Sequence, residues 1–177
     1  MDFGEFLKAL NLDPYVAIDF ETTGLDSESD KIIEVAAVRF EGGEVSDSFS
    51  SLVNPGRSIP EFIVNLTGIN DDMVANSRSE KEVVPKLASF IGDDPIVAHN
   101  INFDYSFYSF LTTKYLPQSK QKNRLCDTLS LSQSCLYFLP NHRLGTVTNY
   151  FGYQQDAAHR AMSDTENCGH IFVRLIK

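Results

Sequence analysis

The amino-acid sequence predicts an α/β domain in which a mixed sheet, an antiparallel meander extended by parallel strands, is flanked by helices. Apolar runs near residues 15–20, 32–40 and 45–53 are separated by turn-forming residues such as Gly42-Gly43, which favours a meander. From about residue 79 onward, helical patterns alternate with short apolar runs, which is typical of helices packed on both faces of a sheet. With 177 residues, 42% of them hydrophobic, the chain suits one domain.

Residues 1–14 are predicted to form an N-terminal helical extension that packs ahead of a domain at residues 15–177. Apolar residues recur at helical spacing here before a proline that stops the pattern: Phe3, Phe6, Leu7, Leu10 and then Pro14.

Turn and cap residues mark the next elements. Asn54-Pro55-Gly56 predicts a turn after the third strand, and residues 59–68 predict a short helix that ends at its glycine. Ser79 and Glu82 have the spacing of a capping box, so a helix is expected to begin there, with a kink at Pro85.

The second half alternates strands and helices. Strands are predicted at residues 95–99 and 124–127, and helices at residues 100–115, 128–136, 144–151 and 162–176. Asn100 is the expected cap of the first of these helices, and His99 before it is expected to be structural. Apolar residues should form the inner sides of the first and last of these helices: Phe103, Phe107, Phe110, Leu111, Ile171, Phe172 and Leu175.

The composition argues against several classes of protein. A net charge of −9 and a pI near 4.8 do not suit a protein that holds long nucleic acid on a broad basic surface. The three cysteines, Cys126, Cys135 and Cys168, lack zinc-site or redox spacing, so we expect reduced thiols. Without a signal-like start or a membrane-spanning apolar run, the chain is expected to be cytoplasmic with no membrane contact.

The most informative segment places two carboxylates at the end of an apolar run. In an extended strand, Asp19 and Glu21 project from one face while Ile18 and Phe20 enter the core. Adjacent carboxylates repel and are tolerated where a hard cation such as Mg²⁺ or Mn²⁺ neutralises them. A lone pair would more often be an exposed acidic strand end, but two further acidic segments follow: His99-Asn100-Ile-Asn-Phe-Asp104 and His159-Arg-Ala-Met-Ser-Asp164.

The spelling and order of these motifs resemble the DEDDh branch of the DEDD 3′-to-5′ exonucleases, the family of the proofreading epsilon subunit of bacterial replicative DNA polymerase. D-x-E-T-T-G, H-N-x-x-F-D and H-R-A-x-x-D each occur once, in the family's order. The resemblance covers roughly residues 15–177 and implies a ribonuclease H-like fold for this exonuclease domain. It also implies hydrolysis at the 3′ end of single-stranded DNA with two divalent cations, Mg²⁺ or Mn²⁺, releasing nucleoside 5′-monophosphates in proofreading or DNA repair.

The resemblance further implies a role for each motif residue. Asp19 would bridge both cations, Glu21 and Asp164 would complete one metal site, and Asp104 would hold the second cation largely through water. His159 is the implied general base, because an imidazole that titrates near neutrality can take a proton from the attacking water. The implied contacts with the terminal nucleotide or its phosphate are Thr22, Thr23, Gly24, Leu25, Asn100, Phe103 and Arg160.

Two alternatives stay open. RNA is the rival substrate, because RNase T and oligoribonuclease resemble the same family, although the Thr-Thr-Gly ending of the first motif is more similar to the DNA proofreading group. The other alternative is a binding module attached to a polymerase or helicase, which the intact acidic positions and His159 argue against. An acidic protein has few basic side chains with which to hold a nucleic-acid strand. A polymerase subunit or helicase domain is therefore the expected partner that holds the nucleic acid nearby.

Overall fold

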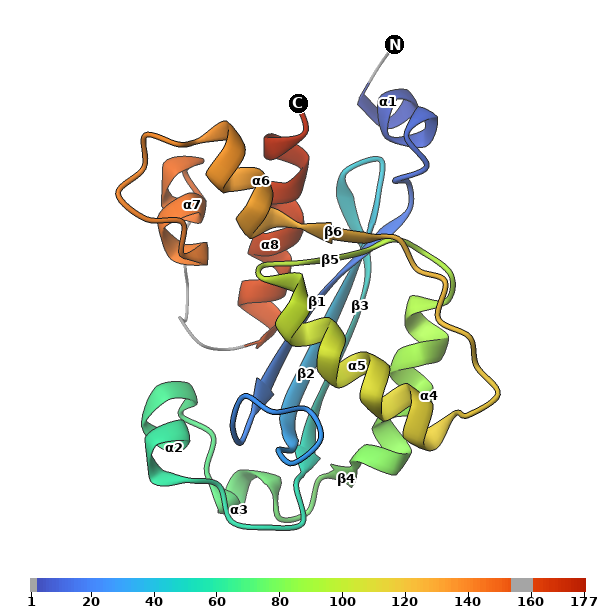
Figure 1. The fold of residues 1–177 in the computed structure, drawn as a ribbon, viewed down its shortest axis with the longest axis vertical. Helices are drawn as coiled ribbons and strands as arrows, with labels where there is room; N and C mark the ends of the chain where they lie inside the picture. Colours follow the sequence, from blue (N-terminus) through green and yellow to red (C-terminus); the bar gives the residue numbers. More distant parts are fainter. Residues whose placement is uncertain (1–2, 154–160) are drawn as a thin grey trace.

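The computed structural model describes residues 3–153 and 161–177, and its centre is a six-stranded sheet in the order β4-β3-β2-β1-β5-β6 (Figure 1). The strands are β1 (Tyr15–Thr22), β2 (Ile32–Glu41), β3 (Glu44–Asn54), β4 (Arg78–Ser79), β5 (Ile96–Ala98) and β6 (Leu125–Asp127). Strands β1 to β3 form the antiparallel meander, and β5 and β6 extend it in parallel, so the predicted mixed sheet is confirmed. The sequence did not indicate β4, a two-residue strand parallel to β3.

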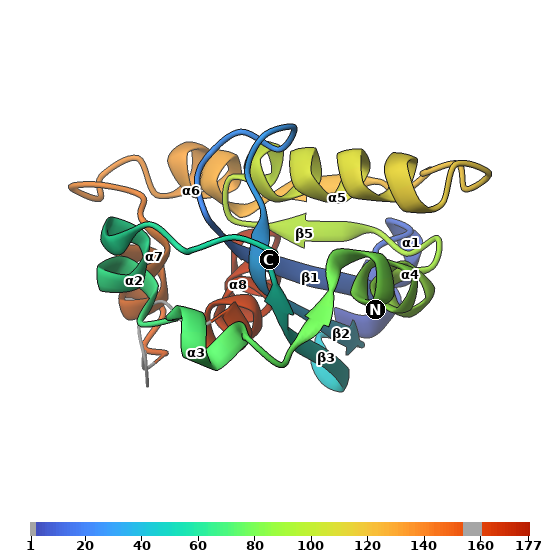
Figure 2. The ribbon, with the colours of Figure 1, turned by 90° about the horizontal axis from the view of Figure 1, so that it is seen from below.

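Helices cover both faces of the sheet. They are α1 (Phe3–Ala9), α2 (Glu61–Thr67), α3 (Asp71–Val74), α4 (Glu80–Ile91), α5 (Ile101–Tyr115), α6 (Thr128–Cys135), α7 (Leu144–Tyr150) and α8 (Ala161–Leu175). Helices α4 and α5 pack on one face and α8 on the other, as the view from below shows (Figure 2). None of the helices in the described ranges is long and apolar enough to cross a bilayer.

The N-terminal helix packs onto the domain. Leu7 of α1 and Leu12 after it are buried in the same cluster as Tyr15 of β1. The Arg124 guanidinium also donates to the Leu10 carbonyl, with 2.7 Å between nitrogen and oxygen. The short segment before β1 therefore adds apolar surface to the core on the α8 face.

The alternation of side chains along β1 divides the core in two. Ile18 and Phe20 are buried in the cluster that includes residues of α4 and α5, whereas Ala17 is buried in the cluster that includes residues of α8. Because successive side chains of a strand point to opposite faces, Asp19 and Glu21 continue the row on the α8 face. The two carboxylates thus project beyond the apolar packing toward the start of α8.

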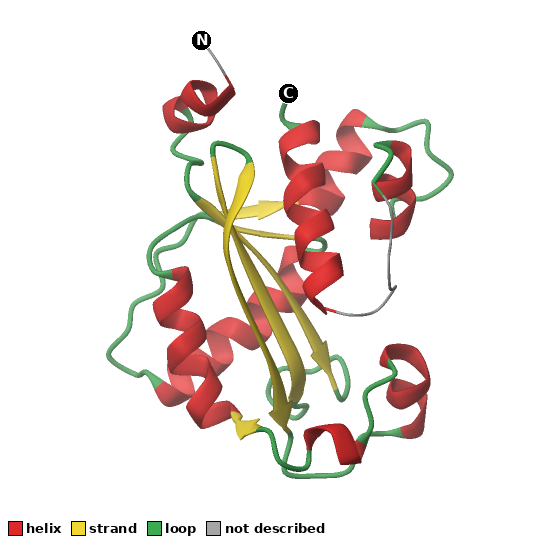
Figure 3. Cartoon of the chain, turned by 180° about the vertical axis from the view of Figure 1, so that it is seen from behind, coloured by secondary structure: helices red, strands yellow, loops and turns green. Residues whose placement is uncertain are grey.

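Helix α8 lies along one face of the sheet (Figure 3), and close contacts near its middle and at its start set its position. The Tyr15 hydroxyl donates to the Gly169 carbonyl at 3.0 Å, and a Cβ at Gly169 would lie 2.1 Å from the Phe40 ring. At the start of the helix, the Ala161 N–H donates to Glu34 Oε2 at 3.2 Å. The start of α8 therefore lies at the same end of the sheet as the carboxylates of β1.

Most local predictions for the helices are confirmed. The Ser79 N–H donates to Glu82 at 3.0 Å, which completes the capping box of α4, and this helix is continuous through Pro85. Gly68 ends α2 with a φ of 73°, a conformation that favours glycine. The short helix α3 was not expected, and its cap is the side chain of Asn70, which accepts from the Met73 N–H.

Candidate active site

A cleft of about 520 Å³ opens at the end of β1. Its wall comes from β1, the end of β5, the start of α7 and the start of α8: Asp19, Phe20, Glu21, His99, Arg143, Leu144, Gly145, Thr146, Asn149 and Asp164. Three of the four acidic residues expected from the motifs thus meet in one cleft, although they come from both ends of the chain.

The carboxylates of this cleft repel one another. Burial, together with the nearby charges of Asp164 and Glu34, raises the pKa of Asp19 to about 7. An acid with such a pKa holds its proton near neutral pH unless a cation compensates the charge. The site is therefore built to favour a bound cation over free carboxylates.

Asp104, the fourth expected acid, lies beside Asp19 but behind the strand end. It is in the first turn of α5, is only 2% exposed, and its Oδ1 accepts a hydrogen bond from the Phe20 N–H at 3.1 Å. Burial and the charge of Asp19 raise its pKa well above the usual range. The Asp104 carboxyl is thus held against the backbone of β1 next to Asp19, and its expected role in holding the second cation stays a prediction.

The donor set suits a hard divalent cation, because carboxylate oxygens are the ligands that Mg²⁺ and Mn²⁺ prefer. Within residues 3–153 and 161–177, no three His, Cys, Asp or Glu side chains already form a coordination shell. Cations that keep several water ligands, as Mg²⁺ does, do not need such a closed shell. The chemistry of the residues therefore fits the implied cations, with water completing the coordination.

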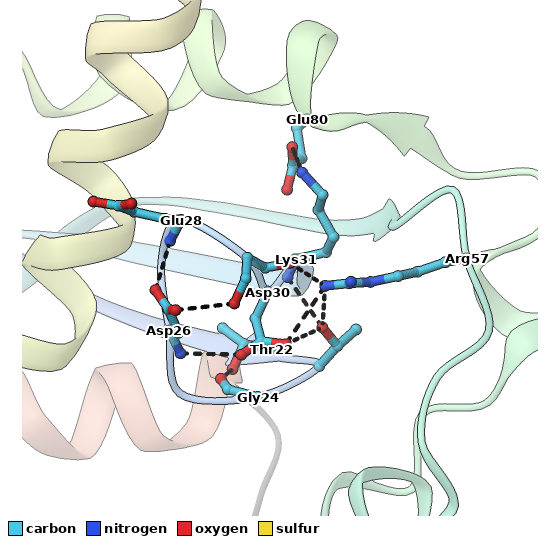
Figure 4. A network of polar contacts seen from close by, with 10 residues as sticks. Thr22, Gly24, Asp26, Glu28, Asp30, Lys31, Arg57 and Glu80 are labelled. Carbon is cyan, nitrogen blue, oxygen red and sulfur yellow. Dashed lines mark hydrogen bonds and ion pairs between the residues drawn. The ribbon is translucent and has the colours of Figure 1, made fainter.

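The loop after the β1 carboxylates is braced by an internal polar network (Figure 4). The Thr22 hydroxyl donates to the Gly24 carbonyl, and Thr22 is buried. A Cβ at Gly24 would lie 2.3 Å from Asp30 Oδ2, so a side chain at this position would displace the aspartate. The loop can take this shape because residue 24 is glycine.

Thr23 sits at the centre of this network. Its hydroxyl accepts from the Lys31 N–H at 3.0 Å and from the Arg57 guanidinium at 3.1 Å, and it lies 3.3 Å from Asp30 Oδ1. Arg57 also donates to the Ser29 carbonyl. The hydroxyls of Thr22 and Thr23 are thus hydrogen-bonded within the loop and hold its shape, and their expected contact with the nucleotide stays a prediction.

Three further expected contact residues, Leu25, Asn100 and Phe103, are not among the described residues that line the cleft. Leu25 is 83% exposed at the tip of the braced loop, Asn100 is exposed, and Phe103 is half-buried against the core with its ring 5.3 Å from that of Phe107. An exposed leucine on a rigid loop is suited to apolar contact with a base. His159, the expected base, and Arg160 lie outside the residues that the structure describes.

The structure corrects the predicted role of Asn100 as the cap of α5. This residue occupies the N-cap position of α5 as expected, but its φ of 72° is left-handed and its side chain makes no cap hydrogen bond. Asp127 of β6 does this instead, because its Oδ1 accepts from the N–H groups of Asn100 at 2.9 Å, Ile101 at 3.4 Å and Leu129 at 3.1 Å. One carboxylate thus supports the starts of both α5 and α6. Burial alone would raise the pKa of Asp127, but hydrogen bonds from the Ser130 hydroxyl and from these N–H groups keep it below the usual range.

Two further residues of the site region were not selected from the sequence. Glu34 of β2 is 3% exposed and lies directly opposite Glu21 in the β1–β2 register. The sequence shows Glu34 as an acidic residue inside the otherwise apolar run 32–38. Only the strand register, however, shows that its side chain is on the same face as the site. Arg143 lines the cleft and is its one arginine or lysine among the described lining residues, which makes it a candidate for contact with a phosphate.

His99 has both ring nitrogens within hydrogen-bond distance of protein oxygens. Nδ1 lies 2.9 Å from the Thr128 hydroxyl and Nε2 lies 2.8 Å from the His142 carbonyl. Burial lowers its pKa, so the ring is neutral near pH 7. This agrees with the expected structural role, although the partners belong to α6 and to the segment before α7.

Comparison with known proteins points to one family. The exonuclease (RNase_T) family model matches residues 16–172. The DNA polymerase III subunit epsilon of Aquifex aeolicus is 36% identical over 163 residues, which cover 92% of this chain and 80% of that protein. The PolC-type DNA polymerase III of Bacillus subtilis is 39% identical over 170 residues, but these cover 96% of this chain and only 12% of that protein. The chain therefore spans a small part of the length of the PolC-type relatives.

Solved structures share the fold. The complex of E. coli exonuclease I with a dA16 oligonucleotide superposes with a TM-score of 0.79 at 19% identity, covering 91% of this chain and 40% of that chain. Exonuclease X in complex with 5′ overhanging duplex DNA gives a TM-score of 0.74 at 22% identity, covering 92% and 90%. The ribonuclease H-like fold expected from the motifs is confirmed.

Proposed function

The chain belongs to the exonuclease family, and we propose that it removes nucleotides from the 3′ end of single-stranded DNA by metal-dependent hydrolysis. The observation that carries this proposal is the convergence of Asp19, Glu21 and Asp164 on one cleft. The similarity to the epsilon subunit of Aquifex aeolicus supports a role in proofreading or DNA repair.

The proposed reaction is the hydrolysis of the last phosphodiester bond. Water attacks the phosphorus, the bond to the 3′ oxygen of the preceding nucleotide breaks, and that oxygen takes up a proton. The terminal nucleotide leaves as a nucleoside 5′-monophosphate, and the shortened strand keeps a 3′ hydroxyl. Divalent cations, when bound, supply neutralisation of the phosphate charge and activation of water.

Each residue then has a proposed task. Asp19, Glu21 and Asp164 hold the cations from the cleft, and Asp104, beside Asp19, holds the second cation largely through water. His159 takes the proton from the attacking water, a role that rests on the sequence motif.

The strand would enter between two exposed features. Leu25 offers an apolar surface to a base, and Arg143 offers a positive charge to a phosphate on the cleft wall. Contacts of these kinds read no particular base, so we propose that cleavage is largely independent of sequence.

The test uses matched DNA and RNA single strands labelled at the 5′ end. Wild-type protein should shorten the DNA from its 3′ end and release nucleoside 5′-monophosphates, with activity lost in chelator and restored by Mg²⁺ or Mn²⁺. Asp19→Ala should abolish this, whereas Asp47→Ala, an exposed carboxylate on β3, should not. Faster cleavage of RNA would select the RNA exonuclease alternative, and binding without cleavage would select the binding module.

We also propose that a polymerase or helicase holds the nucleic acid for this domain. A protein with a net charge of −9 has few basic side chains that can replace the counterions along a DNA strand. The isolated protein should therefore release its substrate after one or a few cuts. Complete digestion of a long labelled strand in the presence of excess unlabelled trap DNA would contradict the need for a partner.

A further inference from the structure

Glu34 is a buried carboxylate for which the proposed reaction has no direct use. It is 3% exposed within β2, and its neighbours along the strand, Ile33 and Val35, are fully buried. A charge in such a position is unfavourable unless hydrogen bonds compensate its lost hydration. Its proximity to Asp19 adds repulsion, so an apolar residue would suit the local environment better.

The hydrogen bond from α8 gives this carboxylate a specific task. Glu34 Oε2 accepts from the N–H of Ala161, the first residue of α8, at 3.2 Å across a separation of 127 residues. The first N–H groups of a helix have no partner inside the helix, and a negative charge near them is favoured by the helix dipole. Glu34 therefore supports the start of α8 from the neighbouring sheet.

This support lies at the start of a helix whose middle is already fixed against the sheet. At Gly169 the helix contacts Phe40 too closely for any side chain, and the Gly169 carbonyl accepts from Tyr15. Eight residues, or about 12 Å of helix, separate Gly169 from Ala161. Two anchors at that separation define both the rotation and the axial position of α8.

Asp164 depends on that position. It lies three residues after Ala161, a spacing that places both residues on one side of the helix, and it lines the cleft with Asp19. We propose that Glu34 is a positioning residue that holds the start of α8 against the sheet so that Asp164 faces Asp19. This inference rests on the proposed function only for the catalytic consequence of that geometry.

Two substitutions of Glu34 separate its hydrogen bond from its charge. Glu34→Gln keeps an oxygen that can accept from the Ala161 N–H, whereas Glu34→Met keeps the length of the side chain without an acceptor. We expect Glu34→Met to lower kcat and to weaken Mn²⁺ binding, measured by calorimetry without substrate, by about 10- to 100-fold with little change in KM. Glu34→Gln should stay within about threefold of wild type if the hydrogen bond is what matters.

The same bond can be removed from the other side. Ala161→Pro deletes the N–H donor while leaving the charge of Glu34, and proline is accepted at the first position of a helix. The double variant of Glu34→Met and Ala161→Pro should have a kcat and a Mn²⁺ affinity no lower than those of the poorer single variant, because both substitutions remove the same hydrogen bond. Glu41→Met, on an exposed residue at the end of β2, is the matched control and should retain Mn²⁺ binding and kcat.

Hydrogen exchange at the Ala161 amide reads the bond without any catalysis. Exchange should be faster in Glu34→Met than in wild type and Glu34→Gln, with the thermal unfolding midpoint used to confirm that each variant is folded. If Glu34→Met binds Mn²⁺ normally, or Glu34→Gln fails as badly as Glu34→Met, the positioning role is wrong. If Glu34→Met does not fold, Ala161→Pro decides, and normal Mn²⁺ binding in that variant overturns the inference. Absence of nuclease activity in the wild type would instead overturn the proposed function.

Discussion

The starts of α5 and α8 each carry one acid of the site, but they place it in different environments. Asp104 of α5 is 2% exposed and accepts a hydrogen bond from the Phe20 N–H. Asp164 of α8 is only partly buried and lines the open cleft beside Glu21. The position on the helix is the same, the first turn, so the difference comes from what each helix packs against.

The carboxylates that support the starts of the two helices also differ in where they lie. Asp127, at the end of β6, is sequence-adjacent to α6 and reaches the start of α5 across two parallel strand ends. Glu34 lies in the middle of the sheet and reaches the start of α8 from beneath. In both cases a carboxylate outside the expected acidic set supports a helix that carries a member of that set.

The largest expected effect distinguishes the two helix-borne acids. Asp164→Asn should lower kcat by on the order of 10²- to 10³-fold, because it removes charge directly at the cleft. Asp104→Asn keeps the oxygen that accepts from Phe20 and should lower kcat by about 10- to 100-fold, as expected for an outer-shell residue.

Stability measurements sharpen this prediction. Without metal at pH 8, Asp104→Asn should unfold at a higher temperature than wild type, because burial raises the pKa of the Asp104 carboxyl and this disfavours the folded state above the ordinary pKa of an aspartate. Asp164→Asn should change the unfolding temperature less. Equal losses of kcat together with equal changes in stability would show that the two acids have the same role.

A second prediction concerns the histidine shortly before α8 in the sequence. His159→Ala should lower kcat by on the order of 10²-fold or more and remove the acidic limb of the pH–rate profile, since a general base must be deprotonated to act. His142→Ala, on a histidine whose Nε2 lies 3.1 Å from the Leu136 carbonyl, serves as the control and should leave that limb in place. An unchanged rate and profile for His159→Ala would exclude this histidine as the base.

The third prediction tests the support of α5. Asp127→Ala removes the acceptor of three backbone N–H groups and should lower the free energy of unfolding by about 1–2 kcal/mol, with a loss of kcat because Asp104 is on the supported helix. Asn70→Ala removes the cap of α3 and should lower stability without changing kcat. Chemical denaturation and single-turnover kinetics on both variants make the comparison, and an unchanged kcat in Asp127→Ala would restrict its role to folding.

The last prediction concerns the pH dependence of the stability of the metal-free protein. The pKa of Asp19 is about 7 in the folded protein, against an ordinary value of 3.8, so between these values the folded state holds a proton that the unfolded state releases. Stability should therefore fall as the pH rises from about 4 to 7 and should level off above that. Thermal unfolding in chelator at pH 5.5 and pH 8 measures this, and the fall should be smaller in Asp19→Asn.

Binding of Mn²⁺ should follow the opposite trend. The cation competes with the proton on Asp19 below pH 7, so the rise in unfolding temperature on adding Mn²⁺ should be larger at pH 8 than at pH 5.5. A stabilisation independent of pH would place the cation away from Asp19.

The sequence by itself determined the parts of this protein that depend on a few adjacent residues. The two-residue period of a strand placed Asp19 and Glu21 on one face, the spacing of Ser79 and Glu82 produced the cap of α4, and Gly68 ended α2. These features are set by backbone geometry within one or two turns. The order of the acidic motifs was also sufficient to indicate the family and hence the fold.

Only the tertiary structure decided how distant segments support one another. The register of β1 against β2 placed Glu34 opposite Glu21, and the packing of α8 brought Ala161 to it. The cap of α5 moved from Asn100 to Asp127, 27 residues away. Such contacts depend on the summed packing of whole elements, and a hydrogen bond across 127 residues leaves no local pattern in the chain.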